Sequence, residues 1–216
     1  MGIKVFITAT NTSIGKTYTT LTLLKECKKL GLKPGVFKPI ETGVADIPLD
    51  GSKLLKKCQE FNEKFRKFMI EDIVLYRFSL PAAPYVAKKD EKIDIDYILK
   101  KADMLQKECD ILFIEGAGGL MVPIKRDFFM IDLIKKLQAK SLLVTPSRLG
   151  SINDTLLSIK ALNDYNIDFN WCINLYEDKE SFFEITYPFY KDYFKKIDIL
   201  QKEAKDILKN LVSNTL

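Results

Sequence analysis

The chain reads Thr-Ala-Thr-Asn-Thr-Ser-Ile-Gly-Lys-Thr over residues 8–17. The apolar run before it, residues 3–7, predicts a buried strand, and residues 18–24 after it predict a helix. A strand, a loop of small residues, Gly-Lys-Thr and a helix form the context that a phosphate-binding loop requires. Backbone N–H groups of such a loop point at one spot, where the helix dipole also favours an anion. The stretch therefore predicts a nucleotide phosphate site.

Two side chains of this loop have the chemistry to bind a nucleotide and its metal ion. Lys16 would place a positive charge on the β- and γ-phosphates, and the Thr17 hydroxyl would be a ligand for Mg²⁺. The common pattern G-x-x-x-x-G-K-[ST] has a glycine where this chain has Thr10. An ordinary strand-to-helix turn that contains Gly-Lys-Thr is the alternative, and a second site further along the chain favours the phosphate-binding loop.

The composition fits one domain over residues 1–216, because 47% of the residues are hydrophobic and can form a full core. The formal charge is +5, from 34 basic and 29 acidic residues. The lysines are spread along helical faces, whereas a nucleic-acid site shows clustering with interleaved aromatics, so no nucleic-acid partner is expected. No apolar run approaches the roughly 18 residues of a membrane span, and no signal peptide precedes the first strand. We therefore expect a cytoplasmic protein without membrane association.

The cysteines are far apart in sequence, and the chain has no histidine. Neither a zinc site nor a disulfide framework is expected from this pattern. Without histidine, a general base must be a lysine, a carboxylate or a group of the substrate. The four cysteines are Cys27, Cys58, Cys109 and Cys172.

Apolar runs and helical patterns alternate along the rest of the chain. Residues 79–85 hold two prolines within four positions and predict a rigid loop without regular structure. The alternation predicts an α/β fold, a single-domain doubly wound, mainly parallel sheet with helices on both faces, of the P-loop NTPase type. The predicted strands are residues 36–40, 73–78, 110–114, 141–146 and 171–175, and the predicted helices are residues 52–67, 94–109, 129–139 and 200–211, with another that opens at residues 148–154.

A second informative stretch is Glu115-Gly116-Ala117-Gly118-Gly119, which follows an unbroken apolar run. Such a run is typical of a central parallel strand that is covered on both faces. In P-loop proteins an acidic residue at the end of a neighbouring strand holds Mg²⁺, and Glu115 fits this role. Residues 116–119 predict a flexible turn, and its glycines allow a ligand to approach the backbone closely. A purely structural glutamate is less favoured, because an unpaired buried carboxylate is costly.

Three further places are candidates, each with an ordinary alternative. Lys38 ends a short strand, where open α/β sheets bind ligands, although a solvent-exposed strand end is the simpler interpretation. Asp50 is either a turn or capping residue or an acidic ligand beside the phosphates. The helix that opens near Gly150 has free N–H groups suited to a carboxylate, but any helix begins this way. With the phosphate loop, these features predict a nucleoside triphosphate with Mg²⁺ and phosphoryl transfer or hydrolysis. They do not name the acceptor.

Four motifs that occur in order resemble those of the dethiobiotin synthetase family, which acts in biotin synthesis. They are residues 10–17, residues 37–43 (Phe-Lys-Pro-Ile-Glu-Thr-Gly), residues 115–123 (Glu-Gly-Ala-Gly-Gly-Leu-Met-Val-Pro) and residues 149–153 (Leu-Gly-Ser-Ile-Asn). The first motif is shared with many ATPases, but the combination is specific. The resemblance extends over roughly the first 175 residues, with comparable spacing between motifs.

The resemblance implies a homodimeric ligase that closes a ureido ring on 7,8-diaminopelargonate with CO₂ or bicarbonate, ATP and Mg²⁺. One amine is carboxylated to a carbamate, ATP phosphorylates the carbamate, and the second amine displaces phosphate. This chemistry suits a chain without histidine, because ATP activates the carbamate and the substrate amine is its own nucleophile.

The resemblance also implies a role for individual residues. Lys16 and Lys38 would stabilise the carbamate and the transferring phosphoryl group. Thr42 would contact the diamine or its carbamate, and Asn174 would approach the nucleobase. The loop from Pro81 to Tyr85 would form a wall of the substrate site. The other implied residues are the metal ligands Thr17, Asp50 and Glu115, the substrate-carboxylate site Gly150, Ser151, Ile152 and Asn153 at the dimer interface, and the nucleotide contacts Thr12, Ser13, Ile14, Gly15, Lys16, Thr17, Tyr18, Asp50, Glu115, Gly116, Ala117, Gly118, Asn174 and Leu175.

Several positions depart from the family's pattern. Ala9 stands where the family has glycine, Asn11 where it has aspartate, and Asp154 where it has histidine. A methyl group at Ala9 narrows the conformational range of the loop, and Asn11 lacks a possible charge contact. Beyond Asn174 the chain has no counterpart of the family's segment with proline and glycine, so relaxed selectivity between ATP and other nucleoside triphosphates is predicted.

A different class is the alternative interpretation: a nucleotide-dependent dimerising switch of the partitioning or septum-positioning type. Those ATPases carry a second lysine five residues before the catalytic one, and this chain has Asn11 there. A related P-loop amidoligase would need a Cys/His site for glutamine hydrolysis, which a chain without histidine lacks.

Overall fold

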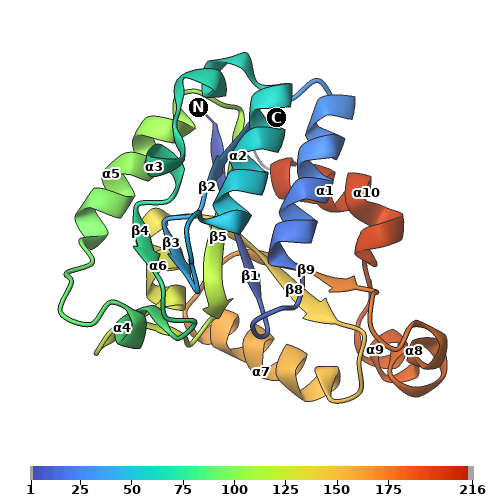
Figure 1. Cartoon of the computed structure of the whole chain (residues 1–216). Coiled ribbons are helices and arrows are strands. Elements are labelled where there is room, and N and C mark those ends of the chain that lie inside the picture. The colour runs from blue at the N-terminus through green and yellow to red at the C-terminus, as the bar shows by residue number, and fades with distance from the viewer. Residues whose placement is uncertain (1, 214–216) are drawn as a thin grey trace.

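The computed structural model describes residues 2–213 of the chain. Its centre is a five-stranded sheet in the order β2-β5-β1-β8-β9, in which every neighbouring pair is parallel (Figure 1). The predicted α/β fold with a parallel sheet is thereby confirmed. The strands of this sheet are β1 (Ile3–Ala9), β2 (Pro34–Phe37), β5 (Ile111–Gly119), β8 (Lys140–Pro146) and β9 (Phe169–Asn174).

Strand β1 lies in the middle of the sheet, between β5 and β8. A strand covered on both faces cannot keep a polar face, which explains the unbroken apolar runs in β1 and β5. Ile7 of β1 lies opposite Glu115 of β5. The phosphate loop and the glutamate therefore lie at the same edge of the sheet. The fully buried residues of these two strands include Val5, Phe6, Ile7, Leu112, Phe113 and Ile114.

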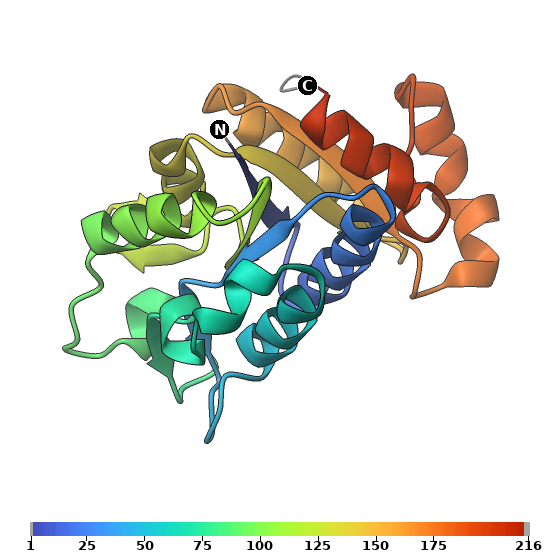
Figure 2. The same cartoon turned by 90° about the horizontal axis from the view of Figure 1, so that it is seen from above.

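Helices cover both faces of the sheet, as predicted (Figures 1 and 2). Helices α1, α2 and α10 pack together on one face, and α5, α6 and α7 cover the other. These helices are α1 (Lys16–Lys29), α2 (Leu49–Phe61), α5 (Ile95–Gln106), α6 (Met130–Leu137), α7 (Ser151–Asp164) and α10 (Leu200–Val212).

The predicted second strand is in fact two strands, because Pro39 interrupts it. Proline has no N–H group and cannot continue the hydrogen-bond ladder. Strand β3 (Ile40–Thr42) leaves the main sheet and pairs in parallel with β4 (Tyr76–Phe78). The strand predicted at residues 73–78 is correspondingly shorter, since helix α3 (Ile70–Ile73) takes up its beginning.

The predicted helix of residues 52–67 is also interrupted. Helix α2 ends at Phe61, and a 3₁₀ turn, η1 (Glu63–Lys67), follows. Between them Asn62 has an extended backbone, and its side-chain amide donates to the carbonyl oxygen of Pro34 at 2.9 Å. The apolar periodicity continues through this break, so the sequence pattern did not reveal it.

Three short elements contradict or extend the prediction for the loops. The segment expected to lack regular structure ends in helix α4 (Pro84–Ala87), because proline fits the first turn of a helix. Strands β6 (Pro123–Lys125) and β7 (Phe128–Phe129) form an antiparallel pair that the sequence did not predict.

The segment after β9 adds helices α8 (Lys179–Ile185) and α9 (Tyr187–Tyr193), which the sequence did not predict, before the predicted α10. A small second core links them to the sheet. Trp171 of β9 packs on Tyr190 of α9, with ring centroids 5.5 Å apart. No helix within residues 2–213 is both long enough and apolar enough to cross a membrane. The buried residues of the second core are Ile173, Phe182, Tyr190 and Ile199.

Candidate active site

The phosphate loop joins β1 to α1 in a strained conformation. Ser13 and Gly15 both have positive φ values, 61° and 95°. Glycine is required at position 15, because a Cβ atom there would lie 2.2 Å from Nδ2 of Asn174. Helix α1 has neither a side-chain cap nor an acidic residue in its first turn. Its free N–H groups and dipole therefore remain available to an anion.

Lys16 is buried beside this loop, and its Nζ donates to the carbonyl oxygen of Asn11 at 3.2 Å. Burial, and next the positive charge of Lys38, lower the pKa of Lys16 to about 8. Lys16 thus lies where a phosphate would relieve an unfavourable charge.

Glu115 forms the centre of a buried hydrogen-bond cluster at the end of the sheet. Its Oε1 accepts from Nζ of Lys38 at 2.6 Å and from the Thr17 hydroxyl at 2.9 Å. Its Oε2 accepts from the Thr20 hydroxyl at 3.3 Å. The glutamate is 1% exposed, so these contacts stabilise a carboxylate that would otherwise be costly to bury.

Lys38 is not the solvent-exposed strand end that the sequence alone favoured, since it is 4% exposed. Burial by itself lowers the pKa of Lys38, but the opposite charges of Glu115 and Asp50 outweigh it and raise this pKa. Lys38 therefore stays protonated inside the site.

Asp50 lies in the first turn of α2, and its Oδ2 is 3.8 Å from Nζ of Lys38. The buried Glu41 holds this turn: it accepts from the backbone N–H groups of Asp50 at 3.0 Å and Gly51 at 2.9 Å. Burial raises the pKa of Glu41, and these hydrogen bonds offset part of that effect. The sequence interpretation missed Glu41, although its place three residues after Lys38 in the second motif was a usable signal.

Strand β5 continues through Gly116 to Gly119, where a turn was expected. The backbone passes so close to β1 that a Cβ atom at Gly116 would lie 2.8 Å from the ring of Phe6. Small residues here thus allow a strand, and not a turn, to run beside the phosphate loop.

One cavity of about 570 Å³ joins most of the predicted residues. It also includes residues to which the sequence interpretation gave no role, among them Ile40, Glu41 and Val122. The predicted residues on its wall are Thr12, Ser13, Gly15, Lys16, Thr17, Lys38, Thr42, Asp50, Pro81, Glu115, Gly116, Ala117 and Gly118.

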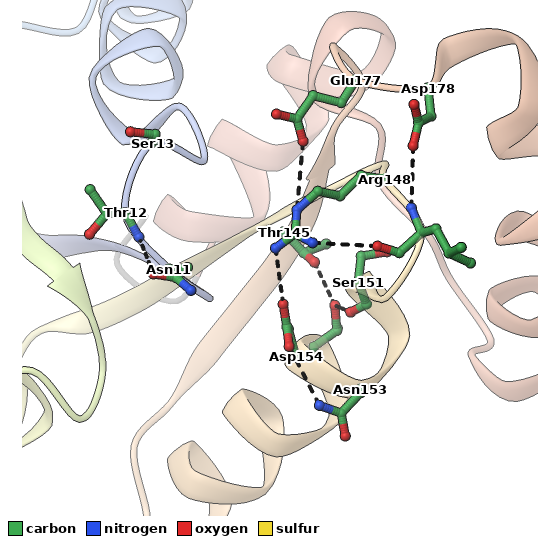
Figure 3. A network of polar contacts seen from close by, with 12 residues as sticks. Asn11, Thr12, Ser13, Thr145, Arg148, Ser151, Asn153, Asp154, Glu177 and Asp178 are labelled. Carbon is green, nitrogen blue, oxygen red and sulfur yellow. Dashed lines mark hydrogen bonds and ion pairs between the residues drawn. The ribbon is translucent and has the colours of Figure 1, made fainter.

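The start of α7 lies apart from this cavity wall, on a separate polar network (Figure 3). Arg148 lies between Asp154, at 3.4 Å, and Glu177, at 3.7 Å. The N–H of Leu149, a residue that is 72% exposed, donates to Asp178 at 3.4 Å. The structure therefore does not place Gly150, Ser151, Ile152 and Asn153 on the wall of this cavity.

Asn174 is buried and contacts the phosphate loop without being part of the cavity wall. Its Nδ2 donates to the carbonyl oxygen of Ile14 at 2.9 Å, and its Oδ1 accepts from Gln201 at 2.7 Å. The neighbouring Tyr176 hydroxyl donates to the carbonyl oxygen of Ser13 at 2.7 Å. Gln201 and Tyr176 were not predicted, since they lie beyond the segment that the motifs cover. Ile14, Tyr18 and Leu175, three further expected nucleotide contacts, lie outside the cavity wall.

The cavity presents the chemistry of a nucleotide site with a hard metal ion. Carboxylate and hydroxyl oxygens are the donors that Mg²⁺ prefers, and Mg²⁺ usually takes its remaining ligands from water and phosphates. Within residues 2–213, no group of three or more His, Cys, Asp or Glu forms a complete metal site. The site thus offers a few oxygen ligands beside two buried lysines.

The fold resembles that of a solved cell division protein complex. The MinC:MinD cell division protein complex of Aquifex aeolicus superposes with a TM-score of 0.58 at 15% sequence identity, covering 97% of this chain and 86% of that chain. At this identity the likeness shows the fold alone, and it does not favour the switch-type ATPase as a function.

Comparisons of sequence identify the family. A family described as an AAA domain matches residues 4–174. The ATP-dependent dethiobiotin synthetase BioD of Sulfurovum sp. (strain NBC37-1) is 60% identical over 191 residues, which are 88% of this chain and 91% of that protein. The protein of the same name from Wolinella succinogenes is 40% identical, over 96% of this chain and 97% of its own length. The chain therefore belongs to the dethiobiotin synthetase family.

Proposed function

We propose that the chain makes dethiobiotin from 7,8-diaminopelargonate, CO₂ and Mg-ATP. The observation that best supports this proposal is the pair of buried lysines, Lys16 and Lys38, which line the same cavity as the phosphate loop and Glu115. Two cations beside a nucleotide site suit a reaction in which a carbamate anion and a phosphoryl group meet. The sequence relatives support the same reaction.

The proposed reaction has three steps. An amine nitrogen bonds to the carbon of CO₂ and loses a proton, which gives a carbamate. A carbamate oxygen then bonds to the γ-phosphorus, and the bond to ADP breaks. The second amine attacks the carbonyl carbon and loses a proton as phosphate leaves, which closes the ureido ring.

In this reaction the chain positions the anions and neutralises their charge. Lys16 would hold the β- and γ-phosphates against the N–H groups of the loop. Lys38 would contact the carbamate and the phosphoryl group as it is transferred, because it lines the same cavity as the phosphate loop, Thr42 and Pro81. These positions favour the reaction because they orient the reacting groups and because the lysine charges are preorganised before the transition state forms.

The metal ligands in this proposal are Thr17, Asp50 and Glu115. Their oxygens suit Mg²⁺, which would supply further neutralisation of the phosphates. Support comes from Glu115, a buried carboxylate that directly contacts the Thr17 hydroxyl. Glu115→Gln should weaken Mg²⁺-dependent nucleotide binding; an unchanged metal requirement would mean that Glu115 is structural.

A homodimer is part of the proposal, because the start of α7 does not reach the cavity of its own chain. The substrate carboxylate would bind at Gly150, Ser151, Ile152 and Asn153 of a second copy. Exposed apolar side chains support an interface on this side of the molecule: Leu149 is 72% exposed and Leu157 is 60% exposed. We place the enzyme in the cytoplasm, where ATP is available.

Nucleotide selectivity is proposed to be relaxed. Each polar end of the Asn174 side chain already makes a hydrogen bond within the protein, to Ile14 and to Gln201, and the residue is 2% exposed, which leaves it little capacity to recognise a base. Turnover with ATP, GTP and CTP tests this point, and a strong preference for ATP would refute it.

The function is tested by phosphate release with Mg-ATP and bicarbonate, measured with and without 7,8-diaminopelargonate. We expect release that depends on the diamine and a product with the mass of dethiobiotin. Release that is indifferent to the diamine would refute the synthetase and favour the switch-type ATPase.

A further inference from the structure

The C-terminal part of the chain contacts two carbonyl oxygens of the phosphate loop. The Tyr176 hydroxyl donates to Ser13 O at 2.7 Å, and Asn174 Nδ2 donates to Ile14 O at 2.9 Å. Asn174 is in turn bonded to Gln201 of α10 at 2.7 Å. Helix α10, which packs beside α1 (Figure 1), is thereby linked to the loop that would hold the phosphates.

These contacts determine which way the N–H groups of the loop point. In a planar trans peptide, the C=O and the following N–H point in opposite directions. A donor that holds Ser13 O therefore turns the Ile14 N–H away from Tyr176, and a donor on Ile14 O turns the Gly15 N–H away from Asn174. Ser13 and Gly15 line the cavity, whereas Asn174 and Tyr176 are not part of its wall. The two contacts thus prepare N–H groups for an anion before it binds.

The loop needs such support because its conformation is costly. Ser13 has a φ of 61°, in the left-handed region that residues other than glycine rarely adopt. A loop that is already ordered loses less conformational entropy when its ligand binds. Hydrogen bonds that hold the loop should therefore appear as nucleotide affinity.

We propose that Tyr176 and Gln201 are positioning residues that hold the phosphate loop in its anion-binding conformation, with Gln201 acting through Asn174. The inference rests on the proposed nucleotide-dependent function. It gives the segment after β9 a part in the nucleotide site, on the side of the loop that faces away from the phosphates.

The direction of each hydrogen bond explains why position 201 is glutamine. The Leu175 N–H donates to Gln201 Oε1 at 3.0 Å, which leaves the Gln201 amide NH₂ to donate to Asn174 Oδ1. With Oδ1 engaged there, Nδ2 of Asn174 faces Ile14 O. A glutamate at position 201 has no donor, so it would attract Nδ2 and leave two acceptors facing each other at Ile14. Gln201→Glu should therefore harm the loop more than Gln201→Ala.

The test measures binding of ATP and of inorganic tripolyphosphate to the full chain by calorimetry, without the diamine. Tripolyphosphate has no base, so it reports on the phosphate loop alone. Tyr176→Phe and Gln201→Ala should each raise both dissociation constants by about two- to tenfold, the effect of one lost hydrogen bond. Gln201→Glu should raise them further. The KM for ATP should rise in the same proportion, and kcat should change less than KM.

Lys205→Gln is the matched control, because it makes the same change in charge as Gln201→Glu at an exposed position of the same helix. It should bind both ligands like the parent chain. Thermal unfolding without ligand shows whether each variant is folded, and binding is compared at a temperature where all of them are.

Four outcomes would overturn the inference, and one of them would also refute the proposed function. Unchanged tripolyphosphate binding in Tyr176→Phe and Gln201→Ala would mean that the contacts do not organise the loop. An effect on ATP alone would assign these residues to the base, and a milder effect of Gln201→Glu than of Gln201→Ala would refute the amide orientation. Intact ATP binding without diamine-dependent turnover would refute the proposed function and leave this inference standing. A parent chain that binds neither ligand would refute both.

Discussion

The buried ion pair of Lys38 and Glu115 allows a prediction about stability, because the loss of Lys38 and the loss of Glu115 should lower the free energy of unfolding by different amounts. Lys38 has a second carboxylate nearby, Asp50 at 3.8 Å, whose side chain is 43% exposed. Glu115 is 1% exposed, and its further partners are the hydroxyls of Thr17 and Thr20. Removing the lysine should therefore cost more than neutralising the glutamate.

The magnitudes follow from this asymmetry. Lys38→Met leaves a buried carboxylate without a cation in contact, which should lower the free energy of unfolding by about 3–5 kcal/mol. Glu115→Gln keeps the shape and leaves Lys38 facing Asp50, so its cost should be about 1–3 kcal/mol. The double variant removes both charges, and its cost should fall short of the sum by about 1–3 kcal/mol.

Urea unfolding at neutral pH, followed by circular dichroism, measures these differences. Lys38→Arg is the control, because it keeps the charge and should destabilise less than Lys38→Met. A Lys38→Met variant as stable as the parent chain, or a double variant whose cost equals the sum of the single costs, would refute the coupling of these two charges.

Three further predictions address the loop and its surroundings. Gly15→Ala should cost about 1–3 kcal/mol of stability and weaken nucleotide binding, because φ is 95° and the new Cβ would lie 2.2 Å from Asn174 Nδ2; unchanged affinity by calorimetry would contradict this. Glu41→Ala leaves two N–H groups of α2 without their acceptor and should cost about 1–2 kcal/mol; a melting temperature equal to that of the parent would count against it. Since the pKa of Lys16 is lowered to about 8, first by burial and then by Lys38, tripolyphosphate affinity should fall as the pH rises through that value and the lysine loses its proton; a flat pH profile would refute this.

The parts of the site that lie together in the sequence could be predicted from it. Lys16 and Thr17 belong to a contiguous loop, and Glu115 follows an apolar run that identifies a central strand. Their meeting follows from parallel strands, whose carboxyl ends share one edge of the sheet. Local patterns thus located both halves of the predicted phosphate and metal site.

The parts that depend on long-range packing could not be predicted. The burial of Lys38 arises because β2 pairs with β5 and brings Glu115 to 2.6 Å, and a strand-end lysine shows nothing of this in its own sequence. The contacts of Tyr176 and Gln201 with the loop join residues far apart in the chain. The domain organisation and the roles of individual site residues stay predictions.

The difference between the two lysines indicates the order in which they would act. Lys38 is already neutralised by Glu115, and this contact raises its pKa, whereas Lys16 contacts a carbonyl oxygen and has a lowered pKa. An anion gains more electrostatic free energy beside Lys16, because the charge of Lys16 is less neutralised by the protein than that of Lys38. The triphosphate should therefore bind first at Lys16. Lys38 would become available to bind an anionic substrate once another cation contacts the Glu115 carboxylate. In a chain without histidine, this unequal compensation would let one lysine serve binding and the other serve the reacting groups.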